Sequence, residues 1–179
     1  MAESTKEFIF ETERLIVRPY STDDLNHFFR LNGDEDVMHY IRPAQTLEQT
    51  KVFLQKIIAD YYIRPGMGRW AMFSKSDHQF AGSFAIIPIE SSTQLQLGYA
   101  LTKENWGKGY ASESVKGGLQ YAFEQLGLHE IAAVTYPENI PSQKVLLKNG
   151  FVFDKTFFED DKELHVYMCR RSGSAGDRV

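Results

Sequence analysis

Apolar residues recur along the chain at two spacings, and the alternation of these spacings predicts the order of the secondary-structure elements. Helical spacing, with apolar residues three and four positions apart, occurs in four segments. These segments begin after Ser21, after Thr46, near Val115 and at Pro141. The first two starts carry a capping-box pattern, because Asp24 and Gln49 follow the capping residues by three positions. Gly127 and Gly150 follow the last two helices, as expected at helix C-termini.

Short apolar runs between polar turns predict about seven strands. They cover Arg14–Arg18, Trp70–Ser74, Phe80–Ile87, Leu95–Leu101, Ile131–Thr135, Phe151–Phe158 and Leu164–Cys169. The resulting order, β-α-α-β-β-β-α-β-α-β-β, predicts an α/β (α+β) fold in which about four helices flank a mixed sheet. We expect one domain over residues 12–171, a flexible N-terminus over residues 1–11 and a mobile tail over residues 172–179.

Composition and charge narrow the class of protein. The chain has 179 residues, of which 42% are hydrophobic and 25% charged, as in a soluble globular domain. Its net charge of −4, without a basic run, indicates no nucleic-acid partner. No apolar run reaches the ~18 residues of a membrane span, and the acidic start lacks the apolar core of a signal peptide. Cys169 is the one cysteine, so we expect a buried strand residue and a cytoplasmic protein.

The segment Asn105–Glu113 contains two glycines, Gly107 and Gly109, between a predicted strand and a strong helical stripe. Glycines allow a tight turn, and the free N–H groups of a helix start form an anion site suited to a pyrophosphate. Lys108 could add a charge-assisted contact. Neither a P-loop nor a complete dinucleotide fingerprint is present, and an ordinary surface turn stays the alternative. Gly118 falls on the apolar stripe, which predicts close packing of this helix against the sheet.

The glycine loop resembles motif A of the GNAT acetyltransferases, Q/R-x-x-G-x-G/A, with Trp106 in place of the first Gln or Arg. A second stretch, Asn139–Phe151, resembles motif B of the same family, and Glu13–Pro19 is similar to the opening of its RimJ/RimL-like members. The resemblance covers residues 12–170. It implies a mostly antiparallel GNAT sheet in which Leu95–Leu101 and Ile131–Tyr136 splay apart, with acetyl-CoA in the gap.

The resemblance also implies the activity, an acetyl transfer from acetyl-CoA as co-substrate to a primary amine, without a metal. The implied cofactor-binding residues are Ala100, Leu101, Thr102, Trp106, Gly107, Lys108, Gly109, Tyr110, Ala111, Ser112, Asn139 and Ser142. Freed backbone groups near Tyr99 would pair with the pantetheine and polarise the thioester carbonyl. Motif B lacks the tyrosine that often serves as the acid, and Ser142 is the nearest hydroxyl. Tyr99, Ser142 and Asn139 are therefore the candidate catalytic residues, although Ser142 and Asn139 also suit a helix start.

Neither the general base nor the acceptor follows directly from the sequence. RimL-like enzymes often carry Glu at the position of Gln96, and an amide cannot take a proton at neutral pH. At pH 7 roughly a tenth of an α-amine is neutral, against about one part in 2,000 of a lysine, a difference of about 3.5 kcal/mol. This favours a peptide α-amine. The alternatives are a small-molecule amine (polyamine, amino sugar or antibiotic) and a catalytically weak acyl-CoA-binding regulatory module.

Several polar residues are candidates for contact with the acceptor. The acidic runs Asp34–Asp36 and Glu159–Asp161 could orient a cationic amine, although such runs are more often solvated turns. His39, Tyr40 and Arg42 occupy the loop that often shapes the acceptor pocket in the resembled family. We expect a small-molecule or peptide amine as the partner, no membrane contact, and a monomer or homodimer.

Overall fold

The computed structural model describes residues 8–90 and 92–172, and its centre is one eight-stranded sheet in the order β1-β2-β3-β4-β5-β6-β8-β7. The strands are β1 (Phe10–Glu11), β2 (Leu15–Pro19), β3 (Gly68–Ser74), β4 (Phe80–Pro88), β5 (Leu95–Leu101), β6 (Glu130–Thr135), β7 (Val152–Glu159) and β8 (Lys162–Arg170). The β5–β6 pair is parallel and the other pairs of neighbouring strands are antiparallel. The predicted mixed sheet is thereby confirmed.

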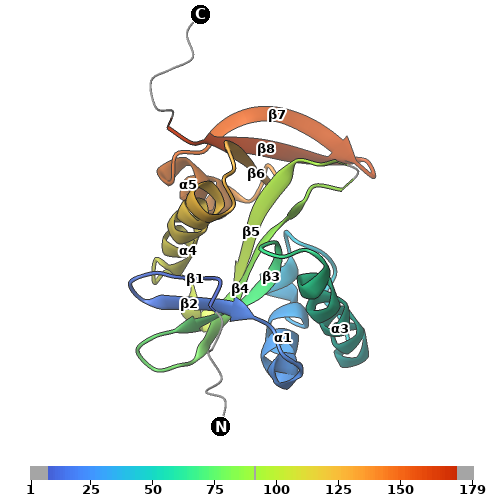
Figure 1. Ribbon diagram of the computed structural model, residues 1–179. Coiled ribbons are helices and arrows are strands. Elements are labelled where there is room, and N and C mark those ends of the chain that lie inside the picture. The colour runs from blue at the N-terminus through green and yellow to red at the C-terminus, as the bar shows by residue number, and fades with distance from the viewer. Residues whose placement is uncertain (1–7, 91, 173–179) are drawn as a thin grey trace, which may run out of the picture.

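Helices cover both faces of the sheet, with α4 and α5 on one side and α1 and α3 on the other (Figure 1). The helices are α1 (Leu25–Asn32), α2 (Glu35–Met38), α3 (Leu47–Ile63), α4 (Tyr110–Gln120) and α5 (Ile140–Lys148). Single turns at Thr22–Asp24, Lys103–Asn105 and Tyr121–Gln125 precede or extend them. Both predicted capping boxes are present, at Ser21 before α1 and at Thr46 before α3. In the described residues, the sequence pattern missed only the four-residue α2 among the α-helices, because one turn has no measurable period.

The predicted flexible N-terminus of residues 1–11 is wrong at its end. Phe10 pairs with Val17 to form β1, and its ring meets the Phe84 ring edge-on at 5.3 Å between centroids. A two-residue strand has no alternation that a sequence pattern could reveal. Residues 1–7 and residues 173–179 of the expected tail lie outside the described part of the chain.

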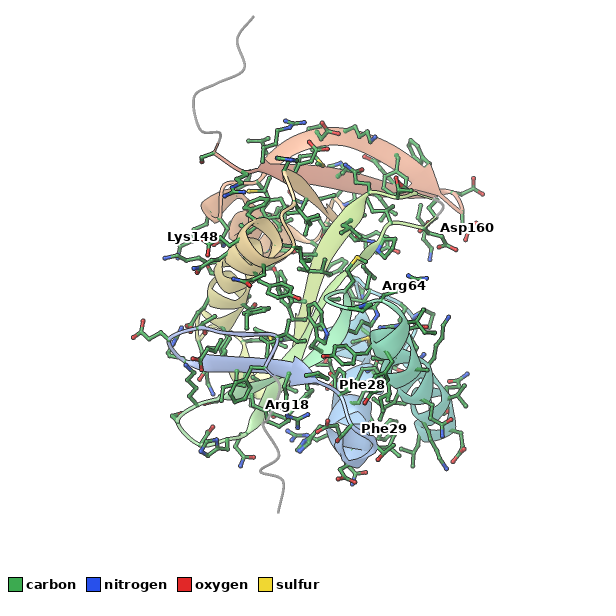
Figure 2. The ribbon with its side chains drawn as sticks, in the orientation of Figure 1. Arg18, Phe28, Phe29, Arg64, Lys148 and Asp160 are labelled. Atoms are coloured by element: carbon green, nitrogen blue, oxygen red, sulfur yellow. The ribbon has the colours of Figure 1, made fainter. Side chains whose placement is uncertain are left out.

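Each face of the sheet has its own hydrophobic core. Trp70, Phe84 and Leu97 pack with Val115 of α4 on one face. On the other face, Phe28 of α1 is buried against the sheet and α3 (Figure 2). This second core is rich in aromatic and aliphatic side chains, namely Tyr20, Phe28, Leu31, Val37, Met38, Leu54, Ile57, Ala71 and Phe80. The two cores fix α4 and α1–α3 on opposite sides of the same strands.

Close approach of α4 to the sheet depends on Gly118, as its place on the apolar stripe predicted. A Cβ atom at this position would lie 2.1 Å from Cζ of Phe84, so only glycine leaves room for the ring. Cys169 is buried in β8, also as predicted, and burial raises the pKa of its thiol. Among the described residues, we find no helix that has the length and apolarity to cross a bilayer.

Candidate active site

The gap between β5 and β6 confirms the splayed pair of strands. The two strands share one paired position, Gln96 with Ala132, whereas β4 and β5 pair at seven positions from Pro88–Leu95 to Gly82–Leu101. After Gln96, the edge of β5 that faces β6 has no paired position with β6. Backbone N–H and C=O groups need partners when they are shielded from water. This stretch of β5 can therefore pair with an extended ligand in the gap.

A cavity of about 280 Å³ opens at the splay. Its walls come from α1, from the loop that follows α2, from strands β3 to β6, and from the start of α5. The candidate catalytic residues Tyr99, Asn139 and Ser142 all line it, as do Gln96 and Ala100. The volume is close to the lower end of small-ligand sites.

Tyr99 and Ser142 meet inside this cavity. The phenol of Tyr99 donates a hydrogen bond of 3.3 Å to Oγ of Ser142. Burial raises the pKa of Tyr99, and the hydrogen bond to Ser142 opposes this shift without cancelling it. Asn139 caps α5 by accepting from the N–H of Ser142 at 3.2 Å, so its predicted N-cap role is confirmed. The site therefore holds a neutral hydroxyl pair next to the splay.

Sequence reasoning reached Tyr99 only through its backbone. Its side chain joins a residue 43 positions later, and this depends on the approach of β5 and α5 in the folded chain. The family resemblance pointed to a tyrosine acid in motif B, where none exists. The structure supplies a tyrosine at the same helix from the neighbouring strand.

The glycine loop turns into α4 through two left-handed residues. Gly107 has φ of 72° and Gly109 has φ of 83°, a region that side chains rarely adopt. Gly109 is the N-cap, and Tyr110, Ala111 and Ser112 form the first turn of the helix. N–H groups of a first turn have no helical carbonyl to bind, and the helix dipole adds positive charge. The arrangement therefore leaves N–H donors that can bind an anion.

A polar cluster ties this first turn to the start of the domain. Glu113 accepts from the Thr12 hydroxyl at 2.6 Å and from Nε and the backbone N–H of Arg14 at 2.6 and 2.7 Å. Arg14 also donates to the carbonyl oxygen of Lys108 at 3.0 Å. Burial opposes ionisation of Glu113, but these hydrogen bonds outweigh it and lower its pKa. The glycine loop is thus held in place from outside α4, a role of Arg14 that its spacing did not reveal.

Some predicted coenzyme contacts are engaged within the protein. The Trp106 indole donates to the Leu101 carbonyl oxygen at 2.9 Å. Thr102 is buried, and its hydroxyl accepts from Asn105 at 2.8 Å. Lys108 donates its ammonium to the side chain of Asn105 at 3.1 Å. Trp106, the departure from motif A, therefore braces the end of β5 against the glycine loop.

A further contact joins the two helices that flank the gap. The Ser112 hydroxyl in α4 accepts from the Asn149 amide at 3.0 Å. Asn149 is the residue after α5. The first turn of α4 and the C-terminal end of α5, the helix that carries Ser142, are therefore fixed relative to one another.

The acidic runs do not gather in the cavity. Asp34 and Asp36 both accept from the Lys103 ammonium, at 3.1 and 2.8 Å, and neither lines the cavity. Asp160 lies in the turn between β7 and β8 at the rim of the molecule (Figure 2). Glu159 is the one carboxylate among the described lining residues. The solvated-turn interpretation therefore fits most of these acids better than a role in orienting the acceptor.

Residues of the loop after α2 do line the cavity. Tyr40 and Arg42 are among them, whereas His39 is not. Sequence reasoning missed Arg69 of β3, which lies on the same cavity wall. In the sequence, Arg69 is a lone arginine just before the predicted strand Trp70–Ser74, and a lone arginine in that position indicates no particular role.

The chain matches the acetyltransferase (GNAT) domain over residues 14–152, so it belongs to the GNAT acetyltransferase family. The uncharacterized N-acetyltransferase p20 of Bacillus licheniformis is 31% identical over 166 residues, which cover 88% of this chain and 92% of the relative.

Two solved structures share the fold. The ribosomal L7/L12 alpha-N-protein acetyltransferase RimL, in complex with coenzyme A, superposes with a TM-score of 0.74 at 17% identity, covering 92% of this chain and 98% of its own. Spermidine N-acetyltransferase from Vibrio cholerae, bound to CoA and spermine, gives 0.73 at 21% identity and covers 88% and 96%. One fold therefore carries both a protein and a polyamine acetyltransferase.

Proposed function

We propose that the protein transfers the acetyl group of acetyl-CoA to a primary amine by direct attack of the neutral amine on the thioester. The observation that carries this proposal is the hydroxyl pair of Tyr99 and Ser142, 3.3 Å apart, in the cavity at the β5–β6 splay. An acyl transfer needs a bound thioester, an oxyanion donor and a proton source. The site offers a residue or backbone group for each.

Acetyl-CoA is the co-substrate in this proposal. Its pyrophosphate would lie at the first turn of α4, where Gly107 and Gly109 expose the N–H groups of Tyr110, Ala111 and Ser112. Its pantetheine would follow β5 along Ala100 and Leu101, where the ladder to β6 is open. CoA bound to the two solved acetyltransferases of the same fold supports this assignment.

The chemistry divides among the residues of the cavity. The nitrogen lone pair of the amine attacks the carbonyl carbon, and a backbone N–H of β5 near Tyr99 stabilises the developing oxyanion. The C–S bond then breaks, and the hydroxyl pair supplies a proton to the departing thiolate. The amine gives up one proton, which restores the pair. The reaction consumes no solvent proton and needs no metal.

A low-pKa amine is the acceptor that the site favours. Gln96 lines the cavity where a general base could act, and its amide cannot take a proton. Lysine would need about 3.5 kcal/mol more than an α-amine to become neutral. The alpha-N-protein activity named for RimL agrees with an α-amine. A cytoplasmic location and a monomer or homodimer complete the proposal, and both rest on the sequence.

The test is a CoA-release assay with a thiol reagent. The purified chain is incubated with acetyl-CoA and with peptides bearing free α-amines, N-blocked lysine peptides, polyamines or aminoglycosides. We expect release that depends on an α-amine. Faster acetylation of lysine side chains would contradict the α-amine assignment. Tight acetyl-CoA binding without release would favour the regulatory module, and no binding at all would refute the proposal.

Variants test whether the Tyr99 phenol supplies a proton or only packs in the site. Tyr99→Phe removes the proton source and is expected to lower kcat by about 100-fold or more while the affinity for acetyl-CoA changes little. Tyr62→Phe, at a tyrosine that is 76% exposed, is the matched control and should leave kcat unchanged. A Tyr99→Phe variant with normal kcat would leave the phenol a packing role only.

A further inference from the structure

The wall of the cavity that faces α3 carries two arginines. Arg42 follows α2, and Arg69 lies in β3. Their guanidinium carbons lie 4.5 and 5.7 Å from the centroid of the Phe53 ring in α3, so one ring supports both. The two cations are therefore held near each other, although they come from distant parts of the sequence.

Neither guanidinium is neutralised within the part of the chain that the structure describes. No ion pair or side-chain hydrogen bond joins Arg42 or Arg69 to another described residue, and Nε of Arg42 is buried without a partner. By contrast, Arg14, Arg18 and Arg170 each pair with a carboxylate. Withdrawing a cation from water without an anionic partner costs free energy. Two arginines at one site, each without such a partner, therefore need a physical explanation.

Like charge adds to this cost. Burial and, to a smaller extent, the nearby charge of Arg69 together lower the pKa of Arg42 to about 10. Burial also lowers the pKa of Arg69. Both side chains stay protonated at neutral pH. A bound oxyanion would relieve both the desolvation and the mutual repulsion.

The arginines lie within reach of the splay. Arg69 pairs with Ala85, and Ala85 pairs with Gly98 of β5, next to Tyr99. Two strand spacings separate these backbones, which gives roughly 10 Å. Paired positions share a face of the sheet, so Arg69 and Gly98 lie on the same face. This is the α1–α3 face, because Ala71, two positions along β3 from Arg69, packs in the core of that face. One small molecule in the cavity could therefore touch the arginines and still place an amine at the splay.

We propose that Arg42 and Arg69 bind an oxyanion on the acceptor itself, so that the substrate is a primary amine that also carries a carboxylate or a phosphate. This inference rests on the proposed acetyl transfer and narrows its substrate class. The described residues that line the cavity include two arginines and one carboxylate, Glu159, although the net charge of the chain is −4. Polyamines and aminoglycosides are polycations and meet repulsion here. A peptide qualifies when an acidic group lies close to its α-amine.

The test compares pairs of acceptors that carry the same α-amine but differ in charge, and the first of the two pairs is also matched in size. Glutamate α-amide is paired with glutamine α-amide, and phosphoserine amide with serine amide, in the CoA-release assay. We expect kcat/KM at least tenfold higher for the anionic member of a pair, and the pair with the larger ratio identifies carboxylate or phosphate. Equal rates within both pairs would overturn the inference.

Variants assign the preference to the arginines. Arg42→Gln and Arg69→Gln should each reduce the preference for the anion at least fivefold, with the Kd for acetyl-CoA unchanged. Arg64→Gln is the matched control, because Arg64 lies at the end of α3, is exposed and does not line the cavity (Figure 2). A preference that survives both cavity variants would also overturn the inference.

A binding arm keeps this test independent of turnover. Calorimetry measures the affinity of glutamate α-amide and glutamine α-amide for the complex of the protein with CoA. Tighter binding of the anion, lost in Arg42→Gln, supports the inference even when no acceptor is acetylated. Failure of the proposed function shows instead as no CoA release with any amine, whatever its charge.

Discussion

The contact between Gly118 and Phe84 provides a test of how the sheet positions the glycine loop. In Gly118→Ala, the new Cβ would lie 2.1 Å from Cζ and 2.7 Å from Cε1 of Phe84. Optimal separation of two carbons is about 3.5–4.0 Å, so the ring or α4 must move. Phe84 is fully buried, and Phe10 packs against it from β1. The ring has little room to withdraw.

Two opposing effects set the magnitude. Replacing glycine by alanine inside a helix gains about 1 kcal/mol of helix propensity. Overpacking a well-filled core costs about 1–3 kcal/mol. Since the overlap is large and the neighbours are buried, we expect the cost at its upper end and a net loss of about 1–2 kcal/mol. For a domain of this length, Tm would fall by about 2–8 °C.

The assay is chemical and thermal unfolding, with acetyl-CoA affinity measured in parallel. The matched control is Gly117→Ala, one position earlier in α4. Its Cβ would press on the side chains of Thr12 and Phe10, which are only half-buried and therefore yield more easily than the fully buried Phe84 ring. We expect the control to stay within about 1 kcal/mol of the wild type.

A double-mutant cycle isolates the contact. Phe84→Leu removes the atoms that Gly118→Ala overlaps, so the double variant should lose less stability than the sum of the single ones, by about 0.5–3 kcal/mol. Movement of α4 should also weaken acetyl-CoA binding, because the first turn of this helix is the proposed pyrophosphate site. A Gly118→Ala variant as stable as the wild type, or an additive cycle, would refute the reasoning.

Further predictions concern ion pairing, pH and the glycine loop. Asp24 accepts two hydrogen bonds of 2.8 Å from Arg18; burial opposes its ionisation, but the Arg18 and Ser21 hydrogen bonds lower its pKa. Its contribution to stability is present above the unfolded pKa of about 3.9 and lost as pH falls through the lowered folded pKa; Asp24→Asn should remove this dependence and cost about 1–3 kcal/mol in urea unfolding at pH 7. The pKa of Tyr99 is raised by burial, so its contribution is present below about pH 10 and lost as pH rises through the folded pKa, a loss that denaturation curves of Tyr99→Phe should lack. Trp106→Phe removes the hydrogen bond to Leu101 and should cost about 0.5–1.5 kcal/mol, with a higher Kd for acetyl-CoA by titration and an unchanged kcat.

Local rules predicted much of the fold. Capping boxes at Ser21 and Thr46 and the glycine turn before α4 depend on neighbouring residues, so their residues could be read from the sequence. The splay followed from the family resemblance. The strand Phe10–Glu11 was missed because its partner, rather than its own pattern, makes it a strand.

The chemistry of the site was harder to predict, since it depends on contacts between distant segments. Tyr99 meets Ser142 only because β5 ends beside α5, and Arg42 meets Arg69 only because both rest on Phe53. Each of these residues is ordinary in its local context. No spacing within one element links them, so their pairing becomes visible only in three dimensions.

The single paired position between β5 and β6 makes the sheet an incomplete one. Main-chain pairing runs through β1–β5 and again through β6, β8 and β7, but it barely crosses the seam. A coenzyme lying in the gap would act as the missing strand, and its binding would then count toward folding. At a concentration of about 100 times Kd this adds ~2.7 kcal/mol. We therefore expect the protein's resistance to unfolding, and to proteolysis at the seam, to follow the local supply of its own co-substrate.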